Sequence, residues 1–301
     1  MSDIVRFYPV ALVLTVAFGI SAVYLFGYLL PSKDYTKSFI FGGLFSMTAI
    51  CYVLSLTTPA GSIPDNKEWE YAENASISVE TAEFKRNGRR RHCKWCAKFK
   101  PDRCHHCRVC KSCVLRMDHH CPWILNCVGF HNHKYFFLLV LYACGTCAMV
   151  AVDLAEAWAH IAVLSPPPQI YQGQHTLLSA TCAVSALLAA ILGAFFAFHG
   201  YLMVSAMTTI EYCEKKRSGG YDSTLYDRGL WTNLRYVLGP NPLLWLFPVR
   251  TQIGDGLVFK MVGSSSGNSQ GKEEQRAAAR QRLAQKPSTV YGSTTAPELL
   301  P

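Results

Sequence analysis

The sequence CKWCAKFKPDRCHHCRVCKSCVLRMDHHCPWILNCVGFHNHKY, from Cys93 to Tyr135, contains eight of the thirteen cysteines and six of the ten histidines of the chain. These residues form a repeat, because the spacing C-x2-C-x9-H-x6-C occurs twice and a shift of 14 residues carries one copy onto the other. The copies are Cys93, Cys96, His106 and Cys113, followed by Cys107, Cys110, His120 and Cys127. The two sets interleave along the chain.

Each copy offers three thiols and one imidazole, which is a complete tetrahedral ligand set for zinc. We therefore predict two structural zinc ions, whose binding supplies much of the folding energy of this segment. The CxxC steps from Cys104 to Cys113 permit other pairings, although the ferredoxin spacing C-x2-C-x2-C-x3-C-P is not met. Mixed Cys/His clustering favours metal in a reducing compartment over secreted disulfides.

The repeat leaves Cys121 without a metal to bind. The tripeptide HHC that ends at Cys107 recurs ending at Cys121, but both ligand sets are complete without this second cysteine. A nucleophilic thiol needs a base to become a thiolate and a third group to orient that base. We predict Cys121 as the nucleophile, His119 as the base and Asp118 as the orienting group. The alternative makes Cys121 a substitute zinc ligand and Asp118 a cap.

The rest of the chain is poor in charge. Only 16% of the 301 residues are charged, against about 25% in an average globular protein, and 50% are hydrophobic. Four stretches contain no Asp, Glu, Lys or Arg: 7–32, 38–64, 135–152 and 157–210. A helix that spans a bilayer needs about 20 mostly apolar residues. We predict four spans, of which the first, second and fourth cover residues 9–30, 39–56 and 177–207. The third begins at residue 135 and runs past residue 152, with Asp153 and Glu156 marking its far end.

The predicted fold is an all-α polytopic membrane protein with four transmembrane helices. A zinc-binding Cys-rich domain with short β-hairpins lies between the second and third helices. We divide the chain into five units. Residues 1–57 and 135–207 contain two spans each, and residues 58–134 form the Cys-rich domain, with its core at 91–134. Residues 208–262 form a C-terminal segment, and residues 263–301 form a disordered tail. The proline-rich loop at 165–168 cannot be helical.

The formal net charge of +9 comes mostly from two polar segments. Residues 58–134 carry 14 Lys/Arg against 8 Asp/Glu, and residues 208–301 carry 12 against 8. The positive-inside rule then places both segments, and both termini, in the cytosol. Because the basic excess is explained by contact with the lipid bilayer, we expect no nucleic-acid partner.

Residues 118–121 read DHHC, and the sequence around them resembles the DHHC-type protein S-acyltransferases, also called palmitoyltransferases. The resemblance covers most of the chain up to about Val249. Further matches are Thr208, Thr209 and Glu211, similar to the TTxE motif of the family, and Asn233 of its C-terminal motif. The chain departs from the family at Thr58-Pro59-Ala60-Gly61, where an Asp-Pro-Gly element is expected, and at Met207.

The resemblance implies a two-step transfer, in which Cys121 attacks a long-chain acyl-CoA and the palmitoyl group then passes to a cysteine of a membrane-associated substrate protein. It also implies an acyl chain held among the spans of an endomembrane protein, in the Golgi, the endoplasmic reticulum or the plasma membrane. One alternative is a membrane-anchored zinc scaffold or ubiquitin-ligase-like module, in which Cys121 is dispensable. Another alternative is a transporter whose path is lined by His199 and Asp153. Transporters often have interrupted helices at matching positions of their two halves, and the sequence shows no such interruptions.

Four residues are candidates for binding the substrate. By likeness and charge Lys100, Arg103 and His105 are expected to contact the phosphates of CoA, and Trp123 is a further candidate. The alternative for these basic residues, and the main expectation for the basic run at 85–91, is contact with anionic lipid.

The remaining expectations concern positioning. Thr209 is expected to hydrogen-bond Asp118, and Glu211 to cap or anchor the C-terminal segment. The small residues at 144–146 lie where the end of the acyl chain is expected, although small residues also permit close helix packing. His199 is expected to be bonded internally rather than to be catalytic.

Overall fold

The computed structural model describes residues 3–71, 81–85, 89–164, 172–218 and 225–261. The proline-rich loop at 165–168, part of the basic run at 85–91 and the tail at 263–301 lie outside these residues, wholly or in part.

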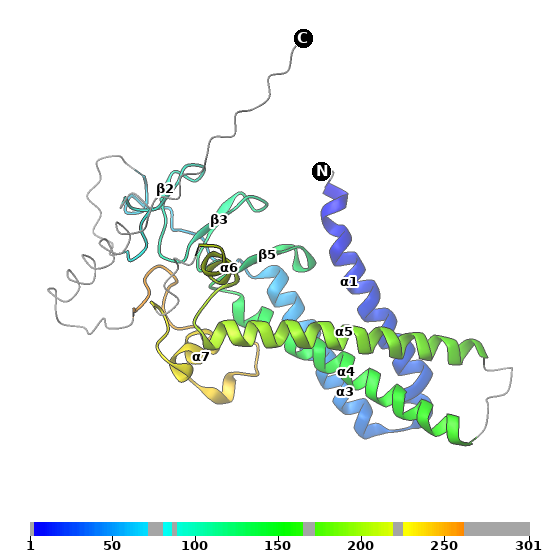
Figure 1. The fold of residues 1–301 in the computed structure, drawn as a ribbon. Helices are drawn as coiled ribbons and strands as arrows, with labels where there is room; N and C mark the ends of the chain where they lie inside the picture. The colour runs from blue at the N-terminus through cyan, green and yellow to red at the C-terminus, as the bar shows by residue number, and fades with distance from the viewer. Residues whose placement is uncertain (1–2, 72–80, 86–88, 165–171, 219–224, 262–301) are drawn as a thin grey trace, which may run out of the picture.

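Four long helices form most of the described chain (Figure 1). They are α1 (Asp3–Tyr24), which continues through the π-helical turn η1 (Leu25–Leu29) into α2 (Leu30–Ser32), then α3 (Tyr35–Thr57), α4 (His133–Leu164) and α5 (Gln172–Val204). The four are long and apolar enough to cross a membrane, over 5–32, 35–57, 133–159 and 173–204. Helix α4 packs against both α3 and α5. This arrangement agrees with the expectation of four spans.

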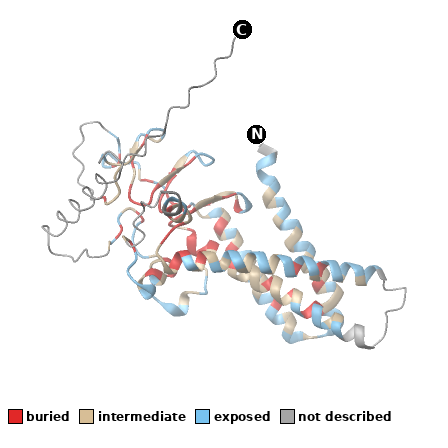
Figure 2. Cartoon of the chain, in the orientation of Figure 1, coloured by how far each residue is buried: buried red, intermediate tan, exposed pale blue. Residues whose placement is uncertain are grey.

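The outer faces of these helices are largely exposed, as Figure 2 shows along α5. The exposed side chains there are apolar, among them Leu187 and Ile191. In a water-soluble bundle such faces would be polar. Exposed apolar faces are instead expected of helices that contact lipid.

The helix of the third span continues past the predicted end of the span. We expected Asp153 and Glu156 to mark the far end; the apolar span ends at Ala159, close to this expectation, while α4 itself continues to Leu164. Asp153 is buried and accepts hydrogen bonds from the Tyr24 hydroxyl and from Lys37 Nζ, the latter at 2.7 Å. Because partners on α1 and α3 compensate the carboxylate inside the bundle, the charge does not require a helix end in water.

Three short antiparallel hairpins lie between α3 and α4. They are β1 (His92–Cys93) with β2 (Lys98–Phe99), β3 (His105–Cys107) with β4 (Ser112–Val114), and β5 (His119–Cys121) with β6 (Asn126–Val128). Each turn contains one left-handed residue, at positions 14 residues apart: Ala97 (φ 49°), Lys111 (φ 54°) and Leu125 (φ 50°). The sequence repeat is therefore a structural repeat, and the expectation of short β-hairpins is confirmed.

The C-terminal segment lies at the same end of the bundle as the hairpins (Figure 1). It contains α6 (Thr209–Ser218), α7 (Leu230–Leu238) and the short 3-10 turn η4 (Pro242–Leu244). Asn233 of α7 donates to the carbonyl of Val204 at the end of α5, at 2.7 Å. Lys134 Nζ at the start of α4 donates to the carbonyl of Leu244, at 2.8 Å. These bonds attach the segment to the ends of two spans.

Candidate active site and metal centres

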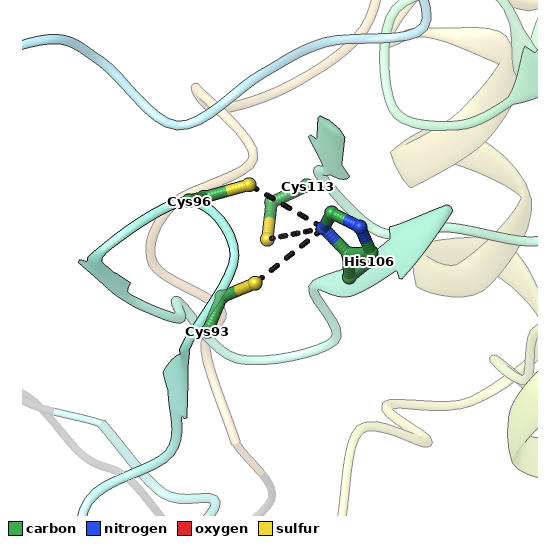
Figure 3. Close-up of side chains that lie close together, drawn as sticks. All are labelled: Cys93, Cys96, His106 and Cys113. Atoms are coloured by element: carbon green, nitrogen blue, oxygen red, sulfur yellow. Dashed lines mark hydrogen bonds between the residues drawn. The ribbon is translucent and has the colours of Figure 1, made fainter. Parts of the chain in front are cut away.

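The first predicted ligand set comes together in space. Hairpins β1–β2 and β3–β4 bring Cys93, Cys96, His106 and Cys113 so close that their ligand atoms all lie within 4.8 Å of one another. The Nδ1 atom of His106 lies 3.4, 3.3 and 3.9 Å from the sulfurs of Cys93, Cys96 and Cys113, as Figure 3 shows. Zn–S and Zn–N bonds of about 2.3 and 2.0 Å at tetrahedral angles separate S from N by about 3.5 Å. The spacing therefore fits a zinc ion.

The second set repeats this geometry between hairpins β3–β4 and β5–β6. Cys107, Cys110, His120 and Cys127 likewise place their ligand atoms within 4.8 Å of one another. His120 again presents Nδ1, at 3.7, 3.4 and 3.5 Å from the three sulfurs in that order. The two clusters thus use the same atoms at repeat-equivalent positions, and together they join the three hairpins.

Cys121 belongs to neither cluster. It is the last residue of β5, is 6% exposed, and packs with Ile124, Val128, Phe136 and Val140 at the start of α4. The short 3-10 turn η2 (Pro122–Ile124), which follows it directly, lies against α1 and α3. The thiol therefore lies where the Cys-rich region meets the ends of the membrane spans.

An aspartate and a histidine adjoin this thiol. The Nδ1 atom of His119 lies 2.7 Å from Oδ2 of Asp118, whose side chain is almost fully buried. Burial alone would lower the pKa of His119, but hydrogen bonds to Asp118 and to the side chain of Cys121 raise it to about 9. Burial would raise the pKa of Asp118, but the hydrogen bond with His119 and nearby positive charge lower it. The arrangement favours an aspartate and an imidazolium.

The expected contact between Thr209 and Asp118 is present. The backbone N–H of Thr209 donates to Oδ1 of Asp118 at 2.9 Å, and its hydroxyl donates to Oδ2 at 2.8 Å. Oδ2 thus serves both Thr209 and His119. The first turn of α6 therefore holds the carboxylate through two hydrogen bonds.

Thr208 and Glu211 form a capping box at the start of α6. The N–H of Thr208 donates to Oε2 of Glu211 at 2.8 Å, and the N–H of Glu211 donates to the Thr208 hydroxyl at 3.3 Å. Glu211 also receives two bonds of 2.7 Å from the guanidinium of Arg103. Burial would raise the pKa of Glu211, but Arg103 lowers it. Glu211 thus both caps α6 and anchors it to the Cys-rich region.

This ion pair changes the expectation for Arg103. Arg103 is 2% exposed, and Glu211 and the carbonyl of Ala206 hold its guanidinium, so its charge and its donors are already engaged within the protein. Lys100 and His105 are half-buried nearby, and Trp123 on η2 is 50% exposed. Burial, followed by the charge of Arg91, lowers the pKa of His105 to about 3, so its imidazole is neutral.

His199 lies closer to the site than the sequence indicated. We expected an internally bonded histidine, but its Nδ1 has no hydrogen-bond partner among the described residues. It lies 4.0 Å from Oδ2 of Asp118, and its ring centre is 5.8 Å from that of His119. The rings of Phe136 and Phe195 flank it. In the sequence, the only indication of this position was a single histidine within an otherwise apolar span.

The fold and the site define a membrane protein with a buried thiol, supported by an Asp–His pair, beside two Cys/His clusters. Residues 86–216 match the sequence model of the DHHC palmitoyltransferase family. The chain is 35% identical over 244 residues to probable protein S-acyltransferase 16 of Arabidopsis thaliana, a match that covers 77% of this chain and 82% of the relative.

Two further relatives carry related names. Palmitoyltransferase pfa3 of Schizosaccharomyces pombe is 36% identical over 221 residues, which cover 72% of this chain and 64% of the relative. Palmitoyltransferase ZDHHC15A of Danio rerio is 35% identical over 202 residues, which cover 64% of this chain and 57% of the relative. The chain therefore spans less than two thirds of the length of these two relatives. It belongs to the DHHC palmitoyltransferase family and is a protein S-acyltransferase.

Proposed function

We propose that the chain transfers a long-chain acyl group, such as palmitoyl, from acyl-CoA to cysteines of membrane-associated proteins by way of a thioester on Cys121. The observation that carries this proposal is a buried thiol that belongs to neither metal cluster and lies on strand β5 two residues after His119 of the Asp–His pair, on the same face of the strand. In the first step the Cys121 thiolate attacks the acyl carbonyl carbon, and CoA leaves as its thiol. In the second step the thiolate of the acceptor takes the acyl group and restores Cys121.

His119 and Asp118 have distinct parts in this sequence of steps. Nδ1 of His119 is committed to Asp118 at 2.7 Å, so Nε2 is the nitrogen that takes the proton of Cys121 and returns it to the departing CoA thiolate. Asp118 fixes the orientation of the imidazole and stabilises its cationic form, as the raised pKa of His119 reflects. Thr209 and the first turn of α6 hold Asp118 in place.

We further propose that the two Cys/His clusters hold structural zinc ions. With four protein ligands at each site, zinc would supply folding energy and no open coordination position for a substrate. The ligands His120 and Cys127 lie on either side of Cys121 in the sequence and belong to its hairpin, β5–β6. The clusters would therefore hold the thiol rigidly at the end of the spans.

The acyl chain is proposed to extend from Cys121 among α3, α4 and α5. Side chains of all three helices, among them Tyr52, Val140 and Leu192, belong to or pack against the hydrophobic cluster that contains Cys121. Lys100 and His105 are the proposed CoA contacts, and Trp123 is proposed to face the lipid or the donor. We propose that the Cys-rich region and both termini lie on the cytosolic side of an endomembrane, where acyl-CoA and reduced thiols are available.

The release of CoA tests this proposal directly. Purified enzyme mixed with palmitoyl-CoA and no acceptor is expected to release about one equivalent of CoA thiol in a burst, because each Cys121 reacts once before slow hydrolysis. Addition of a membrane-anchored cysteine peptide should make the release continuous. Continuous release only with the peptide, without any burst, would indicate direct transfer and contradict the thioester.

The hydroxyl of Thr209 provides a second prediction. In Thr209→Val the bond to Oδ2 of Asp118 is lost while the backbone bond remains. Since a hydrogen bond to a charged group contributes about 1.5–3 kcal/mol, we expect the burst rate to fall about tenfold or more. Thr57→Val, at an exposed position of α3, is the matched control. Equal burst rates for both variants and the wild type would remove Thr209 from the positioning of Asp118.

The small residues at 144–146 were expected either to contact the end of the acyl chain or to permit close helix packing, and their contacts differ. The Cys144 sulfur lies 3.5 Å from the carbonyl of Ala189, and a Cβ at Gly145 would meet Leu44 at 3.7 Å, so these two residues permit close helix packing. Thr146 is buried and its hydroxyl lies 3.2 Å from that of Thr48 on α3. It remains the candidate for contact with the end of the acyl chain.

Thr146→Tyr is therefore expected to shift the enzyme toward shorter chains. Loss of room for about two methylenes at about 0.8 kcal/mol each corresponds to roughly a tenfold change in the ratio of rates for shorter and longer acyl-CoA. Competition between acyl-CoA donors of different length measures this ratio. If chain-length selectivity stays unchanged while the protein folds normally, Thr146 serves helix packing only.

A further inference from the structure

A cavity outside the proposed catalytic site lies between the Cys-rich region and the C-terminal segment. Its volume is about 390 Å³, within the range of about 300–1,000 Å³ typical of small-molecule sites. Five cationic residues line it: Arg103, Arg116, Arg228, Arg235 and Lys260. None of the lining residues in the described part of the chain is acidic. The cavity therefore has the charge of an anion-binding site.

Arg116 is the central observation. The residue is 3% exposed, and its Nε has no hydrogen-bond partner in the part of the chain that the structure describes. The NH1 atom lies 2.6 Å from Nδ1 of His133, which is a neutral partner rather than a counter-ion. Among residues 3–71, 81–85, 89–164, 172–218 and 225–261, no carboxylate forms an ion pair with it, whereas Arg103 has Glu211.

This guanidinium keeps its charge. Burial and the charge of Arg103 lower the pKa of Arg116 to about 10, which still leaves it protonated at neutral pH. The carboxylates of Glu211 and Asp118 act on this charge from a distance, but neither forms an ion pair with it. A buried charge without a directly paired counter-ion is unfavourable, which favours an anion in the cavity.

Aromatic rings form the other walls. The guanidinium carbon of Arg116 lies 5.9 Å from the ring centre of Tyr236, and that of Arg103 lies 4.6 Å from the ring centre of Tyr226. The Tyr236 hydroxyl is buried and has no hydrogen-bond partner among the described residues. It offers a second donor to a ligand in the cavity, and the rings provide flat apolar surface for a carbon skeleton.

The rim of the cavity lies beside an apolar surface. Arg228 and Arg235 flank the first turn of α7, where Leu230 and Trp231 are exposed. Helix α7 packs against α5 next to the end of this span. Exposed tryptophan and leucine beside arginine are typical of a surface that rests on lipid headgroups.

We propose that this cavity binds the phosphorylated inositol headgroup of a membrane lipid, with Arg116 and Tyr236 as buried donors and Arg228, Arg235 and Lys260 at the rim. Arginine pairs with phosphate through two parallel hydrogen bonds, which suits a headgroup that carries several phosphates. A soluble inositol phosphate offers the same chemistry. The membrane-facing rim favours the lipid as the natural source.

Binding measurements on the full chain test the proposal. Inositol trisphosphate is titrated into the detergent-solubilised protein, and nanodiscs with or without phosphatidylinositol bisphosphate report on the lipid. Binding of both probes, or of the lipid alone, supports the site. In either case Arg116→Gln is expected to weaken binding about tenfold or more, and Arg228→Gln or Lys260→Gln about threefold each. Absence of binding to both probes would overturn it.

Controls separate this site from general basic attraction and from the donor site. Arg250→Gln removes one exposed charge of the same segment outside the cavity and is expected to change affinity by less than about twofold. An equal loss in Arg250→Gln and Arg116→Gln would contradict the site. Tyr236→Phe removes only a hydroxyl that has no partner among the described residues, so it provides a second buried test if Arg116→Gln is unstable. Full displacement by equimolar CoA would instead make the cavity part of the donor site and overturn the proposal. Cys121→Ser should bind equally well, so this result is independent of the catalytic proposal.

Discussion

The Cys121→Ser variant is expected to form no acyl adduct with labelled palmitoyl-CoA, whereas the wild type forms one that hydroxylamine removes. A serine hydroxyl at this position is far less acidic than a thiol, and His119 alone does not make it an effective nucleophile. We expect a loss of at least about a thousandfold in the adduct signal, down to background. Gel fluorography or scintillation counting of the protein band measures it.

The metal content of this variant decides between the two roles of Cys121. The ligand atoms of both clusters come together without Cys121, so bound zinc should stay at two ions per chain. A fall to one zinc would make Cys121 a ligand and contradict the assignment. Cys213→Ser is the matched control, because this thiol is exposed on α6 and belongs to neither cluster. Its adduct should equal that of the wild type.

The Cys93→Ser variant is expected to lose one of two zinc ions and much of its thermal stability. Cys93 belongs to the ligand set that joins hairpin β1–β2 to β3–β4, so loss of its thiol removes one zinc ligand and weakens that link. Structural zinc binding contributes about 10–16 kcal/mol in small zinc domains, so partial loss should lower Tm by about 10 °C or more. Elemental analysis and a thermal melt measure both effects.

A zinc content that stays at two in Cys93→Ser would contradict this ligand assignment. Cys104→Ser is the control for loss of a buried thiol that is not a ligand, because Cys104 lies in the same hydrophobic cluster as Cys93 but outside both ligand groups. We expect Cys104→Ser to keep both ions. Comparison of the two variants therefore distinguishes the loss of a zinc ligand from the loss of packing in the hydrophobic cluster.

The Cys-rich region was the most predictable part of the molecule. Its repeat is local, and a period of 14 residues relates both the ligand sets and the hairpin turns at Ala97, Lys111 and Leu125. The four spans were also visible, since each is a long stretch without charge. Both signals depend on neighbouring residues in the sequence, which is why they needed no knowledge of the tertiary fold.

Contacts between distant residues were not predictable in the same way. Asp153 was predicted to mark the end of a span because it is charged, and its partners, Tyr24 and Lys37, could not be foreseen because they belong to other helices. Arg103 was taken as a surface charge, although Glu211, 108 positions later, holds it in a buried ion pair. In each case a charge in the sequence indicated water, and the fold supplied a partner instead.

The site shows the same division. The DHHC run and the TTIE run together predicted the contact between Asp118 and Thr209, which the structure contains. The position of His199 beside Asp118 depends on the packing of α5 against α4, which no local pattern encodes.

Peptide mapping of the acylated enzyme tests the central claim most directly. Wild-type protein is incubated with palmitoyl-CoA without an acceptor, quenched in acid and digested, and the acyl group is located by mass spectrometry. The proposal predicts one palmitoyl thioester, on the peptide that contains Cys121, with the thiols of both clusters unmodified. A palmitoyl group on Cys213 or on another cysteine, with Cys121 unmodified, would contradict it.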